Sequence, residues 1–320
     1  MKDNKHKILT ATILTSLAGL SIYGINKLIN KTATIKDLLY PEETNHTYEW
    51  RFGNIYYTKE GSGSPLLLLH DLNQYGSSYQ WNQVVSKLAQ THTVYTIDLL
   101  GCGRSDHPNI TYTNFLYVQL LCDFISEVIQ EKADVIASGY SSSFLITSCN
   151  INPDIYGKLI LVNPEDLAVL NQAPTHSTKI LKILLETPLI GTLVYNMLNR
   201  KDSIELLFTE RLYYNPFHVS QKEVDICYEA AHLDNGNGRY LMASMAGRYI
   251  NLNIAHALKS INNSIYIISG SHKENKKEIA DQYENYNSAI EFSSVPKTKA
   301  LPELENPSAF LDQINLFLNS

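Results

Sequence analysis

A serine-rich turn is the segment of this chain best suited to nucleophilic chemistry. The apolar run at residues 134–138 leads into Gly139-Tyr140-Ser141-Ser142-Ser143, and a helix-like run follows. A serine on a strained turn between a strand and a helix needs small neighbours, and Gly139 and Ser143 are small. Such a turn would raise the Ser141 hydroxyl at a helix N-terminus, where the helix dipole favours a developing negative charge. The pattern therefore predicts Ser141 as a nucleophile, with a simple capped helix start as the alternative.

Three other segments have the character of functional loops. The run at residues 66–70 leads into His70-Asp71-Leu72-Asn73, and the strand-like run at 93–98 leads into D-x-x-G-x-G-x-S at 98–105. The glycines of the second loop, Gly101 and Gly103, predict a tight turn with left-handed backbone. The segment LPELENP at residues 301–307 precedes the last predicted helix.

Strand-like and helix-like runs alternate along the chain, which is the pattern of a mostly parallel α/β sheet. The continuous apolar run at 66–70 is typical of a parallel strand that is buried on both faces. Residues 167–260 contain helix-like runs and no strand signal, so we expect a helical cap inserted into the sheet domain. Further strands are predicted at residues 93–98, 134–138, 158–163, 264–269 and 290–295, with a strand pair at 47–59.

Composition excludes several classes of protein. With 320 residues, 44% apolar and 18% charged, the chain can bury a full core. Its net charge of −6 argues against nucleic acid as a partner. The four cysteines form no C-x-x-C pair and no H-E-x-x-H occurs, so no metal is implied. The glycine fingerprints of dinucleotide and phosphate sites are also absent, so we expect no cofactor.

The N-terminal segment has the features of a membrane anchor. Lys2, Lys5 and Lys7 precede the uncharged residues 8–26, which as a helix would nearly span a hydrocarbon core of about 30 Å. We predict a single-pass anchor at residues 1–30, a linker at 31–46 and the folded domain at 47–320. Threonines and serines dilute the run, so a cleaved signal peptide remains open. Lysines flank both ends, so the side of the membrane stays undecided.

The four functional segments together resemble the α/β-hydrolase superfamily, in its cap-bearing branch of esterase-like and dehalogenase-like proteins. The loop at 70–73, the turn at 98–105 and the serine turn at 139–143 occur in the order of the family. Residues 301–307 resemble the segment that follows the catalytic histidine. The resemblance covers residues 50–318, and it implies the α/β-hydrolase fold.

The resemblance also implies roles for individual residues. Ser141 would be the nucleophile, and the backbone N–H groups of Leu72 and Ser142 would bind the oxyanion. A haloalkane dehalogenase would need an aspartate as its nucleophile at position 141. The serine found there disfavours that activity. The family has a histidine directly before the L-P-x-L-E-x-P segment, where this chain has Ala300. A methyl group cannot accept the serine proton, so the triad is incomplete.

The remaining triad members are open. The acid would be Glu274, on the loop that also carries Lys273, or Glu165 on the preceding loop. His272 or His70 would have to replace the missing base. Asp71 stands where the family usually has glycine, and its carboxylate would oppose a developing oxyanion unless it is turned away or paired.

Two functions follow from this sequence. One is hydrolysis of ester-type bonds through Ser141; the other is a catalytically inactive pseudo-hydrolase that binds a ligand or partner. In either case aromatic and apolar cap residues are expected to roof a pocket for a small apolar or lipid-like molecule. These cap residues are Leu193, Tyr195, Met197, Leu198, Phe208, Tyr213, Tyr214 and Phe217.

Overall fold

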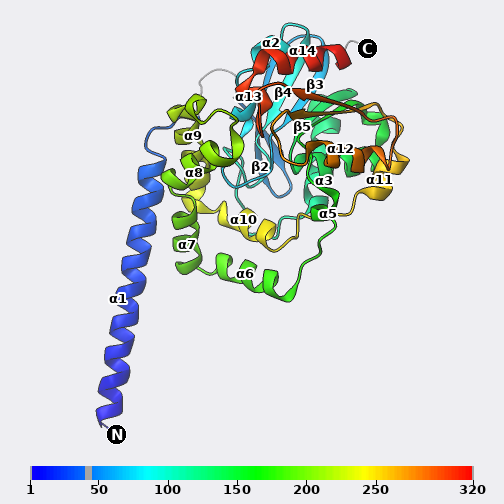
Figure 1. The fold of residues 1–320 in the computed structure, drawn as a ribbon. Helices are drawn as coiled ribbons and strands as arrows, with labels where there is room; N and C mark the ends of the chain where they lie inside the picture. Colours follow the sequence, from blue (N-terminus) through cyan, green and yellow to red (C-terminus); the bar gives the residue numbers. More distant parts are fainter. Residues whose placement is uncertain (1, 40–44, 319–320) are drawn as a thin grey trace.

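The computed structural model describes residues 2–39 and 45–318, with the side chains of 2–11, 13, 14 and 45 outside the described part. Residues 40–44 of the predicted linker also lie outside it. The chain forms one eight-stranded sheet in the order β1-β2-β4-β3-β5-β6-β7-β8, in which β2 pairs antiparallel with β1 and β4 and all other pairs are parallel (Figure 1). The strands are β1 Asn45–Trp50, β2 Gly53–Gly61, β3 Ser64–Leu69, β4 His92–Ile97, β5 Ala133–Ser138, β6 Tyr156–Val162, β7 Ile265–Gly270 and β8 Glu291–Val295. The predicted strands are confirmed.

Helices cover both faces of the sheet (Figure 1). Outside the cap they are α1 Lys2–Ala33, η1 Ser78–Trp81, α2 Val85–Leu88, α3 Asn114–Phe124, η2 Ile125–Ile129, α4 Ser141–Ile151, η3 Pro153–Ile155, α12 Lys276–Glu284, α13 Pro302–Glu305 and α14 Pro307–Leu318.

Between β6 and β7 the chain forms only helices. They are α5 Leu167–Leu170, α6 His176–Glu186, α7 Ile190–Leu198, α8 Lys201–Leu207, η4 Phe208–Leu212, η5 Pro216–His218, α9 Gln221–His232, η6 Leu233–Gly236, α10 Arg239–Ala246 and α11 Ala255–Ser260.

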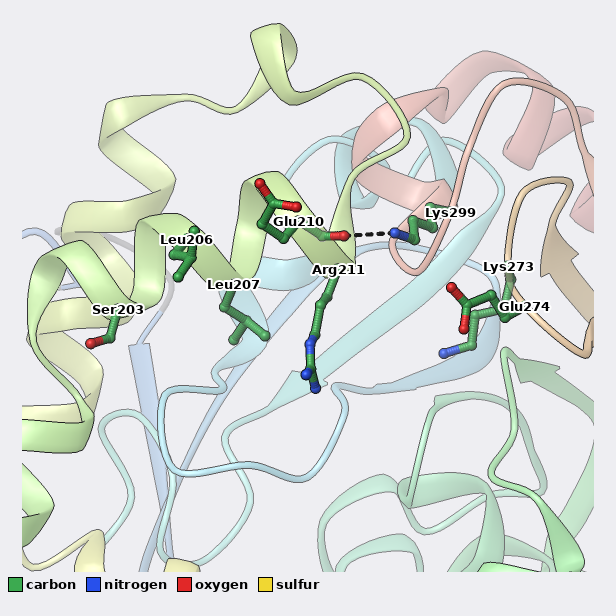
Figure 2. Close-up of a pocket in the computed structure, with 8 residues that line it drawn as sticks. All are labelled: Ser203, Leu206, Leu207, Glu210, Arg211, Lys273, Glu274 and Lys299. Carbon is green, nitrogen blue, oxygen red and sulfur yellow. Dashed lines mark hydrogen bonds between the residues drawn. The ribbon is translucent and has the colours of Figure 1, made fainter.

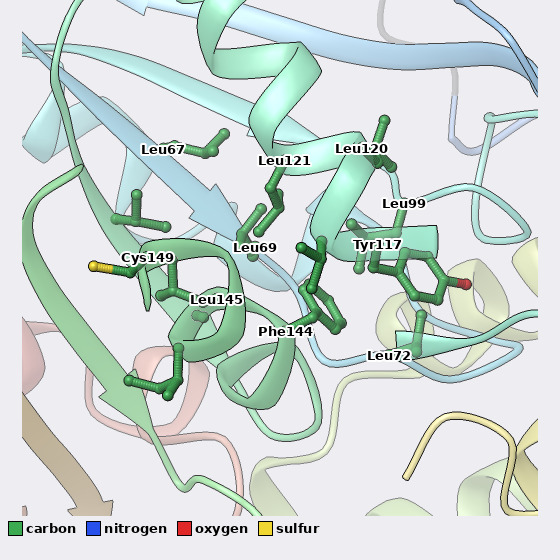
Figure 3. Packing of buried hydrophobic residues seen from close by; sticks show 14 of the residues in the cluster. Leu67, Leu69, Leu72, Leu99, Tyr117, Leu120, Leu121, Phe144, Leu145 and Cys149 are labelled. Carbon is green, nitrogen blue, oxygen red and sulfur yellow. The ribbon is translucent and has the colours of Figure 1, made fainter. Parts of the chain in front are cut away.

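The leucine run of β3 explains why the sheet has two cores. Successive side chains of a strand point to opposite faces, so Leu67 and Leu69 join the layer of α3 and α4 (Figure 3). Leu66 and Leu68 join the opposite layer, and all four side chains are fully buried. On the first face Phe144 stacks on Tyr117 with ring centroids 5.0 Å apart. The central strands are thus fixed by apolar packing on both sides, and the loops at their carboxyl ends are held at one edge.

The C-terminal half of α1 lies against the cap, and its N-terminal half extends away from the domain, beyond α6 (Figure 1). The Asn26 side chain donates to the backbone oxygen of Leu189 at 3.0 Å and accepts from the Asn196 side chain at 3.2 Å. These bonds fix the C-terminal half of α1 beside α7.

Among the described residues, no single helix has both the length and the apolar composition of a membrane span. Helices α6 and α7 meet this measure only together, and they are bent by 99°. The anchor at residues 1–30 and its alternative, a cleaved signal peptide, stay predictions.

Candidate functional site

The left-handed turn between β5 and α4 is made by Gly139, which has φ +53°. Tyr140 is already helical, with φ −57° and ψ −29°, and Ser141 is the first residue of α4. The prediction that Ser141 stands on the strained turn is therefore wrong. Glycine adopts positive φ at little cost, so Gly139 forms the turn itself and is more than a small neighbour of it.

Two serines of the motif serve to attach α4 to the sheet. The fully buried Ser141 hydroxyl donates to the backbone oxygen of His70 at 2.5 Å. The N–H of Ser142 donates to the backbone oxygen of Gly139 at 3.2 Å, and its hydroxyl donates to that of Ala137. Because the turn uses the Ser142 N–H, the prediction of Ser142 as an oxyanion donor is also wrong. Leu72 is buried on the neighbouring loop, and its role as a donor stays a prediction.

The carboxylate of Asp71 lies in the space beside the turn. Its Oδ1 accepts the N–H of Tyr140 at 2.9 Å. A Cβ atom added to Gly139 would lie 2.0 Å from Oδ1 and 2.4 Å from Cγ of the same carboxylate. A side chain at position 139 and the present position of Asp71 therefore exclude each other.

Burial and nearby groups set the ionisation of Asp71. Burial raises its pKa to about 6, the bond from the Tyr140 amide opposes the rise, Glu165 adds to it, and Lys273 opposes it. Burial also raises the pKa of Glu165, which accepts the N–H of Asp166 at 3.1 Å. The structure thus brings the candidate acid Glu165 close to Asp71 and Lys273, with no hydrogen bond to Ser141 in the described chain.

The two candidate histidines are engaged elsewhere. His70 accepts the N–H of Leu99 at Nε2, 3.0 Å away, so its Nδ1 carries the proton and donates to the backbone oxygen of Asp71 at 2.7 Å. His272 stacks on Tyr214 at 3.9 Å between ring centroids. Its Nδ1 lies 3.0 Å from the Ser271 hydroxyl. Over the residues that the structure describes, no hydrogen bond joins either imidazole to Ser141, so a base role for His272 stays a prediction without a supporting contact.

Ala300 is held by its backbone. Its N–H donates to the Leu212 oxygen at 2.8 Å, and its oxygen accepts from the Asn163 side chain at 2.9 Å. In the described part of the chain no three His, Cys, Asp or Glu side chains converge as metal ligands would.

A buried carboxylate that the sequence analysis missed stands behind Asp71. The Asp71 N–H donates to Gln80 Oε1 at 2.9 Å, and Gln80 Nε2 donates to Glu303 Oε1 at 2.6 Å. Glu303 is fully buried, and Oε2 has no partner among the described atoms. Burial raises the pKa of Glu303 to about 8, so it holds its proton at neutral pH. Its position in LPELENP gave no signal beyond the motif itself.

The sequence pattern of the alpha/beta hydrolase family matches residues 66–303, which is more than half of the chain. The chain belongs to the alpha/beta hydrolase family. The resemblance to the α/β-hydrolase superfamily that was inferred from the sequence is confirmed.

An uncharacterised protein of Mycobacterium tuberculosis is 33% identical to this hydrolase-family chain over 103 residues, which is 32% of the chain and 30% of that protein. The chain thus spans less than a third of the first curated relatives that it matches.

Two solved structures share the fold. A serine hydrolase involved in carbazole degradation aligns with a TM-score of 0.71 and 16% identity, over 86% of this chain and 98% of that one. A membrane phospholipase A aligns with a TM-score of 0.68 and 16% identity, over 98% of both chains. At this identity the likeness shows the fold alone.

The family gives the turn at Gly139 its significance. In α/β-hydrolases the nucleophile occupies the strained strand-to-helix turn, and the N–H of the next residue helps to bind the oxyanion. In this family member the turn carries no side chain, and the next N–H, that of Tyr140, is occupied by Asp71.

The cavities of this hydrolase-family chain differ from the expected apolar pocket. A cavity of about 70 Å³ lies beside Asp71, with Tyr75, Phe208 and Leu212 in its wall. Ligand sites usually measure about 300–1,000 Å³, so this cavity is too small for a lipid-like molecule. Of the predicted roof residues, Met197, Leu198, Tyr214 and Phe217 are exposed instead. They do not close a pocket, because the side chains of Met197 and Leu198 on α7, of Phe217 on η5 and of Tyr214 before η5 face solvent.

A larger cleft of about 890 Å³ opens between the cap and the loops after β7 and β8. Figure 2 shows Arg211 and Lys273 reaching from opposite walls toward the space between them. Leu206 and Leu207 line the cap wall, and the predicted acid Glu274 lies beside Lys273. Lys273 also lowers the pKa of Asp71, so the cleft adjoins the site formed by Asp71 and the turn at Gly139.

Proposed function

We propose that this α/β-hydrolase family member binds a ligand without hydrolysing it, and that it is not an esterase that works through Ser141. One observation carries the proposal: the nucleophile turn is Gly139, and the Asp71 carboxylate fills the space and uses the amide that a reacting acyl group would need. A negative charge at that amide opposes an oxyanion there.

The other catalytic positions support the same conclusion. By resemblance to the family, Ala300 replaces the base, and Lys273 stands on the loop of the acid. Loss of a nucleophile or a base costs up to about six decades in rate. We therefore expect no catalysed hydrolysis of esters.

The cleft supports an anionic, lipid-like ligand. Three cationic side chains line the cleft, against the two carboxylates of Glu210 and Glu274; the cations are Arg211, Lys273 and Lys299. Arg211 and Lys273 reach into the cleft from two walls, and the described part of the chain gives the Arg211 side chain no hydrogen-bond or ion-pair partner. An unpaired guanidinium is suited to a carboxylate or phosphate group. Leu206 and Leu207 offer an apolar wall beside these charges. A small amphiphile with an anionic head fits this combination better than a neutral molecule.

A labelling experiment tests the absence of hydrolysis. The full chain is treated with a fluorophosphonate probe and assayed with p-nitrophenyl butyrate. We expect neither labelling nor turnover above the Ser141→Ala variant. The positive control combines Gly139→Ser, Asp71→Gly, Lys273→Asp and Ala300→His, and it should label at position 139. Labelling of the unmodified chain that is lost in Ser141→Ala would overturn the proposal.

A titration tests the ligand class. Octanoate and its neutral counterpart 1-octanol are titrated into the chain by calorimetry. We expect octanoate to bind more tightly, and Arg211→Gln to weaken octanoate at least tenfold, because one charge-assisted hydrogen bond is worth about 1.5–3 kcal/mol. The exposed Arg200→Gln is the matched control. Equal affinity for both probes would refute an anionic ligand.

We also propose that α1 attaches the chain to a membrane. The proposal is supported by the uncharged residues 8–26, which precede the part of α1 that contacts the cap. On α1, Leu17 and Leu20 are exposed. After an alkaline wash, the chain should remain with the membrane fraction, and Leu17→Glu with Leu20→Glu should release it. Equal release of both chains would refute the attachment.

A further inference from the structure

Large apolar side chains gather on the outer surface of two adjoining cap helices, α6 and α7. Six of them are each 46–63% exposed, and we call this surface the cap corner. Single exposed apolar residues are ordinary, but a group on adjoining elements indicates an interaction surface. The cap corner consists of Ile180, Ile183, Leu184, Ile190, Met197 and Leu198.

The orientation of α6 is unusual for a helix that faces water. A surface helix of a soluble domain normally turns its apolar stripe to the core. In α6 only Leu185 is buried, whereas Ile180, Ile183 and Leu184 face outward. Because these side chains stay about half exposed in the folded domain, they are available to a partner.

Helix α1 leaves the domain at the cap corner. The bend between α6 and α7 includes Leu189, whose backbone oxygen accepts from Asn26 of α1. A methyl group on Gly19 would contact the Leu189 side chain at 3.8 Å. Beyond this point α1 continues past α6 (Figure 1). Leu20 and Tyr23 follow Gly19 on α1 and are exposed, and tyrosine is common at membrane interfaces.

The charge around the cap corner favours an anionic surface. Residues 176–199 contain a single acidic residue, Glu186, and Lys182 neutralises it at 2.6 Å. Lys179 is exposed beside the corner. A basic residue near an anionic bilayer contributes about 1 kcal/mol to binding. The corner therefore combines apolar surface with net positive charge.

We propose that the cap corner lies on the surface of a bilayer that contains anionic lipids, beside the point where α1 leaves the domain. This inference deepens the proposed membrane attachment through α1 and is independent of the proposed ligand. The apolar side chains of α6 and α7 would enter the region between headgroups and acyl chains, to a depth of about 5–10 Å.

Depth-sensitive quenching tests the contact. Both native tryptophans, Trp50 and Trp81, are buried, so a new surface tryptophan can be measured by difference. Ile183→Trp reports on the cap corner. Leu316→Trp, on the exposed face of α14 at the other end of the domain, is the matched control (Figure 1). Each full-length variant is mixed with phosphatidylcholine and phosphatidylglycerol vesicles with or without brominated acyl chains, and bound protein is isolated by flotation.

We expect brominated lipid to reduce the emission added by Ile183→Trp about twofold, as for a residue near the acyl boundary, and to leave that of Leu316→Trp unchanged. Flotation without quenching of Ile183→Trp would overturn the corner contact while leaving the attachment through α1 intact. Absence of flotation would overturn both. A lipid-free dimer that Ile183→Glu dissociates, together with unquenched emission, would assign the corner to a second copy of this chain and overturn the inference.

Discussion

Gly139→Ala adds one methyl group where the Asp71 carboxylate now lies. The new Cβ would stand 2.0 Å from Asp71 Oδ1, so either the carboxylate or the turn must move. The backbone contributes a second cost, because φ +53° is unfavourable for alanine. Overpacking costs about 1–3 kcal/mol, and left-handed backbone about 1–3 kcal/mol. We expect the free energy of unfolding to fall by about 2–6 kcal/mol.

A double-mutant cycle separates these two costs. In the Asp71→Ala background the carboxylate is gone, so Gly139→Ala should cost only the backbone part, about 1–3 kcal/mol. The free energy of unfolding is measured by urea denaturation of the full chain, followed by circular dichroism. Gly24→Ala adds the same methyl group where nothing lies within 4 Å, and it should not destabilise the chain.

The coupling energy between the two substitutions decides the result. A coupling of about 1–3 kcal/mol is expected from the overlap of the methyl group with Asp71. If Gly139→Ala costs the same in both backgrounds, Asp71 does not occupy the space beside the turn. The account of the blocked site would then be incorrect.

Three further substitutions test the buried polar groups. The folded chain keeps the Glu303 proton up to a pKa of about 8, whereas the unfolded chain releases it near 4.5, so stability falls as the pH rises through that window. Urea titrations should show that Glu303→Gln removes this fall, which is on the order of 5 kcal/mol. Ser141→Ala should cost only about 1 kcal/mol, the value of one buried hydrogen bond, because its hydroxyl bonds to the His70 backbone. Burial alone would raise the pKa of Asp98, yet Arg104, 2.8 Å away, brings it down to about 2. Arg104→Met should therefore reduce the free energy of unfolding by about 3–5 kcal/mol and lower the melting temperature. A reduction below about 1 kcal/mol would refute the pairing.

Local patterns of the sequence were sufficient to predict the architecture of the sheet. The leucines of β3 predicted a strand buried on both faces, because a run with no polar residue has no face for solvent. Gly101 and Gly103 predicted a left-handed turn, and they have φ +85° and +50°. Such features depend on residues close together in the chain, so the sequence alone determined them and the family resemblance.

Only the tertiary structure decided the chemistry of the site. Ser141 and Gly139 are two residues apart, and both are compatible with a strand-to-helix turn until the backbone angles show which one has positive φ. Asp71 meets that turn across 69 residues of chain, and Glu303 reaches Asp71 through Gln80 from the far end of the domain. These contacts depend on the packing of distant loops at one edge of the sheet, which no local pattern encodes.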